Sequence, residues 1–204
     1  MMSEKEDSAT RIRQAAVQIL MEVGVRAATT RMVTERAGVG RGLLNHYFRW
    51  SELRADAWGE IFDQLLDQEA QASQEPQALM ESYLNSAFEQ NNRIYWFLWL
   101  EAADLAKTDA ALAVVMTRVQ RRMLEQLASY LRLGTEQGLW QAPDPEGTAL
   151  RLSALYDGLA NMLLTQSTQL SPEQAEQHLR RLFFLETRPI SVSSAGQAEP
   201  VRGC

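Results

Sequence analysis

The segment 30–53, TRMVTERAGVGRGLLNHYFRWSEL, constrains the fold of this chain more than any other part of it. It contains two short amphipathic helix patterns, the first ending near Ala37 and the second running from Arg41 to about Tyr47. Gly38 lies between them, where a tight turn requires a residue that tolerates a positive φ. Two short helices joined by a turn with glycine are typical of a helix-turn-helix, whose second helix can enter the major groove of DNA.

The remainder of the sequence also shows a helical pattern. Apolar residues recur at spacings of three and four, and no convincing alternating strand pattern occurs in the sequence. The sequence therefore predicts an all-α fold of about nine helices. The expected ranges are 10–23 with Gly24 as a stop, 30–37 with Thr30 as N-cap, 41–47, 51–72 with Ser51 as N-cap, 77–91, 94–106, 110–134, 146–167, and a last helix after a capping box at Ser171-Pro172-Glu173-Gln174.

These helices are expected to form a head and a body, followed by a tail. Residues 8–53 form a three-helix DNA-binding head, 54–187 an α-helical ligand-binding and dimerisation body, and 188–204, which lack periodicity, a disordered tail. The connection at 73–76 is short, so we expect a rigid join through the helix 51–72. The core of the head is expected to contain Ile19, Leu20, Met32, Val33, Ala37, Val39, Leu43, Leu44, Tyr47 and Phe48.

The charge is distributed unevenly along the chain. The net charge is −6, but residues 1–50 carry eight basic and five acidic side chains, a balance of +3, which leaves −9 for the remaining 154 residues. A basic amino-terminal module on an acidic body fits a DNA-binding head whose body has another task.

Composition excludes several other classes. No apolar run approaches the roughly 20 residues that a bilayer span requires, and the charged amino terminus is unlike a signal peptide, so we expect a cytoplasmic protein with no membrane partner. The single cysteine, Cys204, excludes an internal disulfide and a cysteine-ligated metal site. The two histidines, His46 and His178, have no neighbouring cysteine or carboxylate cluster, and we expect neither an enzyme nor a cofactor.

The second helix of segment 30–53 carries side chains suited to reading bases. We expect Arg41, Gly42, Asn45 and His46 to face DNA, because arginine can bind guanine and asparagine adenine through paired hydrogen bonds, and glycine permits close approach. Contacts to phosphates are expected from Thr30, Arg31, Tyr47, Arg49 and Ser51.

The pattern T-x-x-[MI]-V-x-x-x-A-G-V-x-x-G-[LI]-[LI]-x-H-Y-F-x-x-x-x-x-L resembles the TetR family of bacterial one-component regulators, closely over residues 10–55. The ending His46-Tyr47-Phe48 is most similar to the branch of the choline-sensing betaine-pathway repressor. Two positions depart from the family: Gly40 replaces the usual Ser or Thr cap, and Ser51 the usual phosphate-contacting Lys. The resemblance implies a dimeric repressor that a small-molecule effector releases from a double-stranded DNA operator.

The helix 94–106 carries aromatic or aliphatic side chains on every side, so we expect it to be buried within the body. Plain core packing is one explanation for these aromatics; the resemblance implies instead an effector cavity surrounded by the central helices. The candidate pocket residues are Trp58, Phe62, Tyr95, Trp96, Trp99, Glu101, Asp104 and Tyr156. Glu101 and Asp104 beside tryptophan would suit a cationic effector, or they pair with Arg118, Arg121 or Arg122.

The last two helices present wide apolar stripes, which predict a partner. Packing within the monomer absorbs part of them, and a four-helix bundle with a second copy explains the rest. The segment Tyr156-Asp157-Gly158-Leu159 resembles the family's [IY]-D-G-L motif at the dimer-forming helix. We expect a homodimer that reads a palindromic operator, with an interface formed by Leu152, Leu155, Leu159, Leu163, Leu179, Leu182 and Phe183.

The expected mechanism is a two-state linkage, in which the effector favours a conformation with wrongly spaced recognition helices and the helix 51–72 carries the change to the head. The rival hypothesis is a ligand-binding or protein-interaction module on the same fold that no longer binds DNA specifically.

Overall fold

The computed structural model describes residues 2–167 and 169–187, and the tail predicted at 188–204 lies outside them. The described residues form nine α-helices and one 3-10 helix, which confirms the predicted all-α fold. In chain order these are α1 (Met2–Ala27), α2 (Thr30–Ala37), α3 (Arg41–Tyr47), α4 (Trp50–Ala72), α5 (Pro76–Asn85), η1 (Gln90–Asn92), α6 (Arg93–Leu105), α7 (Ala110–Glu136), α8 (Pro145–Thr165) and α9 (Pro172–Glu186).

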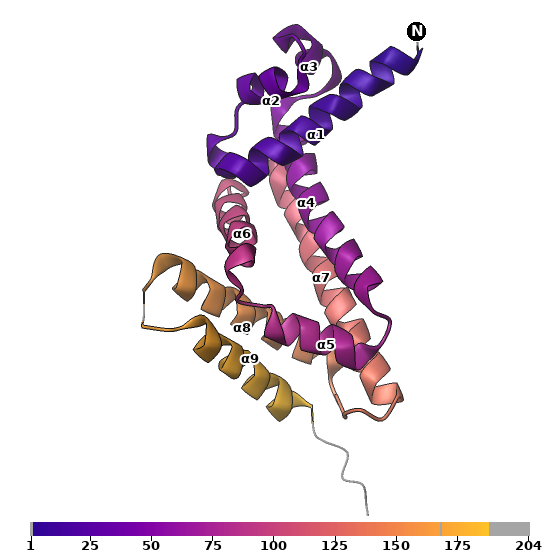
Figure 1. Cartoon of the computed structure of the whole chain (residues 1–204), viewed down its shortest axis with the longest axis vertical. Coiled ribbons are helices and arrows are strands. Elements are labelled where there is room, and N and C mark those ends of the chain that lie inside the picture. Colours follow the sequence, from indigo (N-terminus) through magenta and orange to yellow (C-terminus); the bar gives the residue numbers. More distant parts are fainter. Residues whose placement is uncertain (1, 168, 188–204) are drawn as a thin grey trace, which may run out of the picture.

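The molecule is elongated, with α1, α2 and α3 at one end (Figure 1). The long helices α4 and α7 lie side by side and run from this head to the far end of the body, where α5, α8 and α9 gather. Helix α6 runs from α8 back to α1, so the head rests on two supports, α4 and α6. No helix in residues 2–167 or 169–187 is long and apolar enough to cross a membrane.

The head closes around a small apolar core. Leu20, Val33 and Leu44 are completely buried, so each of the three helices contributes a side chain that is removed from water. Gly38 has a φ of 65° in the turn between α2 and α3, as predicted. Leu43 is an exception among the predicted core residues, because its side chain remains 36% exposed on the outer side of α3.

The N-caps predicted for α2 and α4 are wrong, and α1 begins at Met2 rather than at residue 10. The N-cap of α2 is Thr29, whose hydroxyl accepts a hydrogen bond from the Met32 amide, and Thr30 is the first helical residue. Helix α4 begins at Trp50 after Arg49, so Ser51 lies inside its first turn and caps nothing. In contrast, the capping box at Ser171 is present with both of its hydrogen bonds.

The body is held by ion pairs between α4 and α7. Asp63 accepts hydrogen bonds from Arg118 and Arg122, and these contacts hold the pKa of Asp63 below its ordinary value. Nearer the head, Arg54 and Asp109 form a largely buried ion pair, in which Nη2 of Arg54 lies 2.6 Å from Oδ2 of Asp109. Because a broken pair at such a site leaves an uncompensated charge, α4 and α7 are expected to move together rather than slide apart.

Helix α1 kinks at Gly24, where the sequence predicted a stop, and continues to Ala27. Gly24 has a φ of 85° and a ψ of 174°, and the helical hydrogen-bonding pattern continues on either side of this kink. A Cβ at this position would lie 2.5 Å from Oε2 of Glu101 and 2.7 Å from the Phe97 ring. Gly24 is therefore required both by the backbone conformation and by the close approach of α6.

Replacing Gly24 by alanine should destabilise the protein, because alanine is strained at this φ and its methyl group overlaps α6. We expect Gly24→Ala to lower the free energy of unfolding by about 1–3 kcal/mol. Denaturant unfolding followed by circular dichroism measures this change. Gly42→Ala is the matched control, since a Cβ at Gly42 meets nothing within 4 Å; this exposed helical position should gain about 0.5–1 kcal/mol. Equal stability of the two variants would contradict the assigned role of Gly24.

Candidate DNA-binding surface and effector cavity

The outer face of α3 carries all four side-chain positions that were expected to read bases. Arg41, Gly42, Asn45 and His46 are exposed, while Leu44 on the opposite face is completely buried. The face is therefore fixed by the packing of Leu44, which leaves the other positions free to contact a groove. Tyr47 is half-buried, and its ring meets the edge of the His46 ring with centroids 5.1 Å apart. Contact with DNA remains a prediction for each of these residues.

The basic residues around α3 differ in how far neighbouring acids engage them. Arg31 pairs with Glu35 at 2.7 Å, and Arg36 binds Glu22 through both of its terminal nitrogens. Arg49 forms a weaker ion pair at an exposed position, with its Nη1 4.0 Å from Oε1 of Glu52. Within the described part of the chain no ion pair engages Arg41, so its guanidinium group is available to an external partner.

Gly40 precedes α3 with an extended backbone and gives no side-chain hydrogen bond to the first amides of the helix. This is the structural consequence of its departure from the family's usual Ser or Thr. Thr30 and Ser51 are half-buried at the starts of α2 and α4. Their contacts with phosphate, like that of exposed Arg31, remain predictions.

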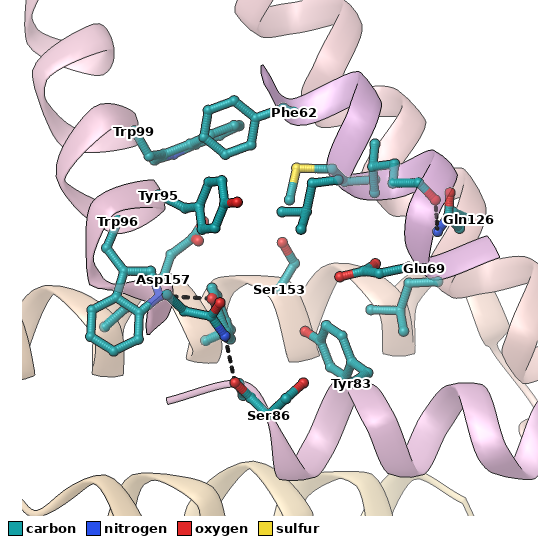
Figure 2. Close-up of a pocket in the computed structure, with 18 of the residues that line it drawn as sticks. Phe62, Glu69, Tyr83, Ser86, Tyr95, Trp96, Trp99, Gln126, Ser153 and Asp157 are labelled. Carbon is teal, nitrogen blue, oxygen red and sulfur yellow. Dashed lines mark hydrogen bonds between the residues drawn. The ribbon is translucent and has the colours of Figure 1, made fainter. Parts of the chain in front are cut away.

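A cavity of about 260 Å³ lies in the body between α4, α5, α6, α7 and α8. Its lining combines apolar side chains with an unusual number of aromatic rings. The seven aromatic residues are Phe62, Tyr83, Tyr95, Trp96, Trp99, Tyr130 and Tyr156. Figure 2 shows Phe62 and Trp99 across the end nearest the head, with Tyr95, Tyr83, Glu69 and Ser153 directed into the space below them.

Five of the eight predicted pocket residues line this cavity: Phe62, Tyr95, Trp96, Trp99 and Tyr156. Trp58 does not. It is completely buried, its Nε1 donates a hydrogen bond to the Leu98 carbonyl oxygen, and its ring packs against Phe62 and Trp99 from behind. Trp58 therefore supports the cavity wall and fixes α6 to α4.

Glu101 and Asp104 also lie outside the cavity, contrary to the prediction. Glu101 accepts a hydrogen bond of 2.6 Å from the Val25 amide, and Asp104 pairs with Arg26 and with Lys107. The reason is helical phase: Glu101 follows Trp99 by two residues, and positions two apart do not share a helix face.

The alternative partners suggested for these two acids are also wrong. Arg118 and Arg122 bind Asp63 and Asp67 of α4 instead. The expectation that α6 is buried on every side fails as well, because Phe97 is 39% and Leu100 36% exposed.

The carboxylates of the cavity are Glu69 of α4 and Asp157 of α8, which sequence reasoning missed. Both residues remain exposed, yet desolvation by the surrounding protein raises the pKa of Glu69 and raises that of Asp157 to about 6. A signal was present for Glu69, which follows Phe62 by seven positions on one helix face.

The carboxylates Glu69 and Asp157 also affect the hydroxyl groups of Tyr83 and Tyr156. Burial is the main cause that raises the pKa of both phenols, and the charges of Asp157 and Glu69 raise them further. Tyr156 also accepts a hydrogen bond of 2.8 Å from Nε1 of Trp96, which fixes this side of the wall (Figure 2). No lysine, arginine or histidine occurs among the described residues that line the cavity.

The residues predicted for the dimer interface instead belong largely to the core of a single chain. Leu152 and Leu179 are completely buried, Leu159 and Leu163 are nearly so, and Leu155, Leu182 and Phe183 pack against the same core at half-buried positions. The apolar pattern was sound, but α8 and α9 satisfy it against each other and against α5, α6 and α7. The large apolar side chains of these two helices that remain exposed are Leu150, Met162, Phe184 and Leu185.

Known proteins resemble both parts of the chain. Residues 12–51 match the family model "Bacterial regulatory proteins, tetR family", and residues 76–183 match "BetI-type transcriptional repressor, C-terminal". The HTH-type transcriptional regulator YhgD of Bacillus subtilis (strain 168) is 26% identical over 157 residues, which is 72% of this chain and 80% of that protein.

Solved structures share the fold at low identity. A transcriptional regulator from Saccharomonospora viridis in complex with choline superposes with a TM-score of 0.73 at 18% identity, covering 92% of this chain and 98% of the other. A TetR transcription regulator from Haloarcula marismortui gives 0.75 at 17% identity, covering 90% and 100%.

A helix-turn-helix head on an α-helical body with an internal cavity is the design of a DNA-binding transcriptional regulator that also binds a small molecule. The chain belongs to the TetR family of such regulators. Because the matches cover head and body alike, the rival hypothesis of a module that has lost DNA binding is not favoured. The proteins of this family regulate transcription and are not enzymes, and the described residues contain no group of three or more acids, histidines or cysteines that could hold a metal ion.

Proposed function

We propose that this protein is a dimeric repressor, acting in the cytoplasm, whose hold on a palindromic operator is relieved by an organic cation bound in the body cavity. The observation that supports the choice of ligand is the composition of the cavity wall. Seven aromatic side chains and two carboxylates line it, and none of its described lining residues is basic.

Such a wall suits a positive charge for two reasons. Aromatic faces attract cations through their electric quadrupole, and the attraction grows when water is excluded. Glu69 and Asp157 have lost part of their hydration, as the raised pKa of each group records, so a cation replaces favourable interactions that water no longer supplies. An anionic effector would lack any compensating basic group and would meet both carboxylates. The choline held by the Saccharomonospora viridis regulator is a ligand of this chemical class.

The head supports the other half of the proposal. Arg41 and Asn45 stand exposed on one face of α3 and can form paired hydrogen bonds with guanine and adenine. One copy of α3 reads a few base pairs, and a palindromic operator requires two copies related by a two-fold axis. Repression rather than activation is favoured by the BetI-type repressor match over residues 76–183.

We place the dimer contact on the part of α8 and α9 that single-chain packing leaves open. Phe184 is 55% and Leu185 60% exposed near the end of α9, and Met162 is 41% exposed on α8. A Cβ at Gly158 would meet nothing within 4 Å, so the single chain does not require glycine there. A second copy packed closely against α8 explains both the glycine and the exposed apolar side chains.

Removing the Arg41 side chain should weaken specific DNA binding more than removing another arginine of the head. We expect Arg41→Ala to cost about 1–3 kcal/mol in affinity for an operator selected by the wild-type protein from random DNA. Fluorescence anisotropy at fixed salt gives the Kd. Arg36→Ala is the matched control, because Arg36 is already engaged by Glu22; its effect should stay within about 0.5 kcal/mol. Equal losses for the two variants would argue against base reading by Arg41.

Cation binding should strengthen as the pH rises through the pKa of Asp157. This carboxyl is protonated below about pH 6 and negatively charged above it, and the raised pKa of Glu69 shifts its ionisation in the same direction. For one coupled proton, the affinity for choline is expected to rise about tenfold from pH 5 to pH 7. Isothermal titration calorimetry at both pH values measures it, and Asp157→Asn should remove most of the rise.

Two controls isolate the role of charge in that experiment. The neutral isostere 3,3-dimethyl-1-butanol has the shape of choline without its charge and should bind weakly at both pH values. Glu136→Gln changes an exposed carboxylate near the end of α7, outside the cavity, and should leave the pH dependence intact. The cationic assignment is wrong if the isostere binds as tightly as choline, or if tetraethylammonium and spermidine also fail to bind while an apolar acid does.

Charges introduced at the end of α9 should separate the dimer. We expect the double variant Phe184→Glu, Leu185→Glu to sediment as a monomer at micromolar concentrations at which the wild type is dimeric, because each interface would then bury four carboxylates without partners. Val114→Glu, at a position of α7 that is 71% exposed, is the control and should remain dimeric. A double variant that still dimerises would show that the copies meet elsewhere.

A further inference from the structure

Helix α6 presents two different faces to two different parts of the molecule. Tyr95, Trp96, Trp99 and Ala103 line the cavity. Phe97, Glu101 and Asp104, spaced four and three residues apart, form another stripe that contacts the kink of α1. Helix α6 therefore connects the wall of the cavity directly to the head, and a movement of α6 would act on both.

Glu101 is the centre of the contact with α1. Its Oε2 accepts a 2.6 Å hydrogen bond from the Val25 amide and a longer one of 3.3 Å from the Arg26 amide. These two amides follow Gly24, whose extended ψ breaks the helical path and directs the chain past α6. Val25 is completely buried, so its amide has little access to water as a substitute partner. Asp104 adds an ion pair to Arg26 one turn further along α6.

Helix α4 is the other helix that connects the cavity to the head, and ion pairs restrain it along its length. Asp63 and Asp67 bind Arg118 and Arg122 alongside the cavity, and nearer the head Arg54 binds Asp109, the N-cap of α7, so ion pairs hold α4 to α7 at three positions of α4. Both carboxylates of α6, in contrast, are bound to α1. The hydrogen bond from Trp58 to the Leu98 carbonyl fixes the middle of α6 to α4. The end of α6 that bears Glu101 and Asp104 is therefore held to α1 of the head rather than to α7.

We propose that Glu101 is the positioning residue through which occupation of the cavity changes the orientation of the head. A ligand against Tyr95 and Trp99 shifts the end of α6, and the carboxylate of Glu101 carries the Val25–Arg26 segment of α1 with it. The inference rests on the proposed function, which supplies the ligand as the signal and DNA binding as the response. The contact between Glu101 and α1 is independent of that proposal. Helix α4, expected from the sequence to carry the change, then acts as the pivot.

A double-variant cycle tests this coupling without a ligand. Ala103→Trp places a large side chain in the cavity and stands in for an occupant. We expect it to change the affinity for the selected operator about fivefold or more in the wild-type background, and less than about twofold when Glu101→Ala is also present. Equal changes in both backgrounds overturn the proposal, as does the absence of any change in the wild-type background.

Three further variants separate a positioning role from a merely structural one. Glu101→Gln keeps an acceptor oxygen and should keep most of the response. Glu60→Ala should leave the response unchanged, because Glu60 is a half-buried residue of α4 whose Oε1 accepts a hydrogen bond from Gln64 of the same helix. Circular dichroism and the melting temperature verify folding. If Glu101→Ala does not fold, Glu101→Asp replaces it, because a shorter side chain withdraws the carboxylate from the two amides while keeping the charge.

The hydrogen-exchange rates of the Val25 and Arg26 amides measure the coupling between the cavity and α1 in the absence of DNA. Ala103→Trp is expected to change the exchange rates of these two amides and to leave that of Val33, whose amide bonds to the Thr29 carbonyl in the head, unchanged. If no operator can be selected, the proposed function fails and this measurement alone decides the inference. Unchanged exchange at Val25 and Arg26 with the cavity filled would falsify it.

Discussion

One hydrophobic core passes through the junction of head and body, and the orientation of the head depends on it. Completely buried Ile12 and Val33 of the head belong to the same cluster as Trp58 of α4 and Leu98 of α6. The three short helices of the head bury few side chains by themselves, and small units with small cores are marginally stable. The packing that stabilises the head therefore also ties it to α4 and α6, two of the helices that line the cavity.

Local signals in the sequence were sufficient for the helices, and they failed where tertiary position decides. Gly38 and Ser171 act through the backbone of a few neighbouring residues, and both were identified correctly. Gly24 was correctly identified as a break, but it kinks α1 rather than ending it. The cap of α2 was misplaced because Thr29 and Thr30 have the same chemistry, and only the extended φ and ψ of Thr29 distinguish them. Ser51 is a good cap by type, but the packing of Trp50 against the core starts α4 one residue earlier.

The lining of the cavity was also predicted only in part. Its aromatics could be predicted because family resemblance placed a pocket among the central helices. Its carboxylates could not be inferred from proximity to tryptophan in the sequence: Glu101 adjoins the aromatic run yet faces α1, whereas Glu69 lies thirty residues from Trp99 and faces the cavity. Leu152 and Leu179 were assigned to the dimer interface for another reason. An apolar stripe records that a face is buried but not by which chain, and Leu152 and Leu179 are buried by their own.

In the proposed mechanism, the two carboxylates would supply the energy difference that a switch requires. A ligand shifts a conformational equilibrium only by as much as its affinities for the two states differ. Desolvation makes the charged forms of Glu69 and Asp157 unfavourable in the cavity, as the raised pKa of each group indicates. A conformation that encloses them more tightly is therefore costly when empty and becomes accessible when a cation compensates their charge. Closing α6 on the cation would draw Trp99 inward and move Glu101, on the other face of the same helix, together with the α1 amides bound to it.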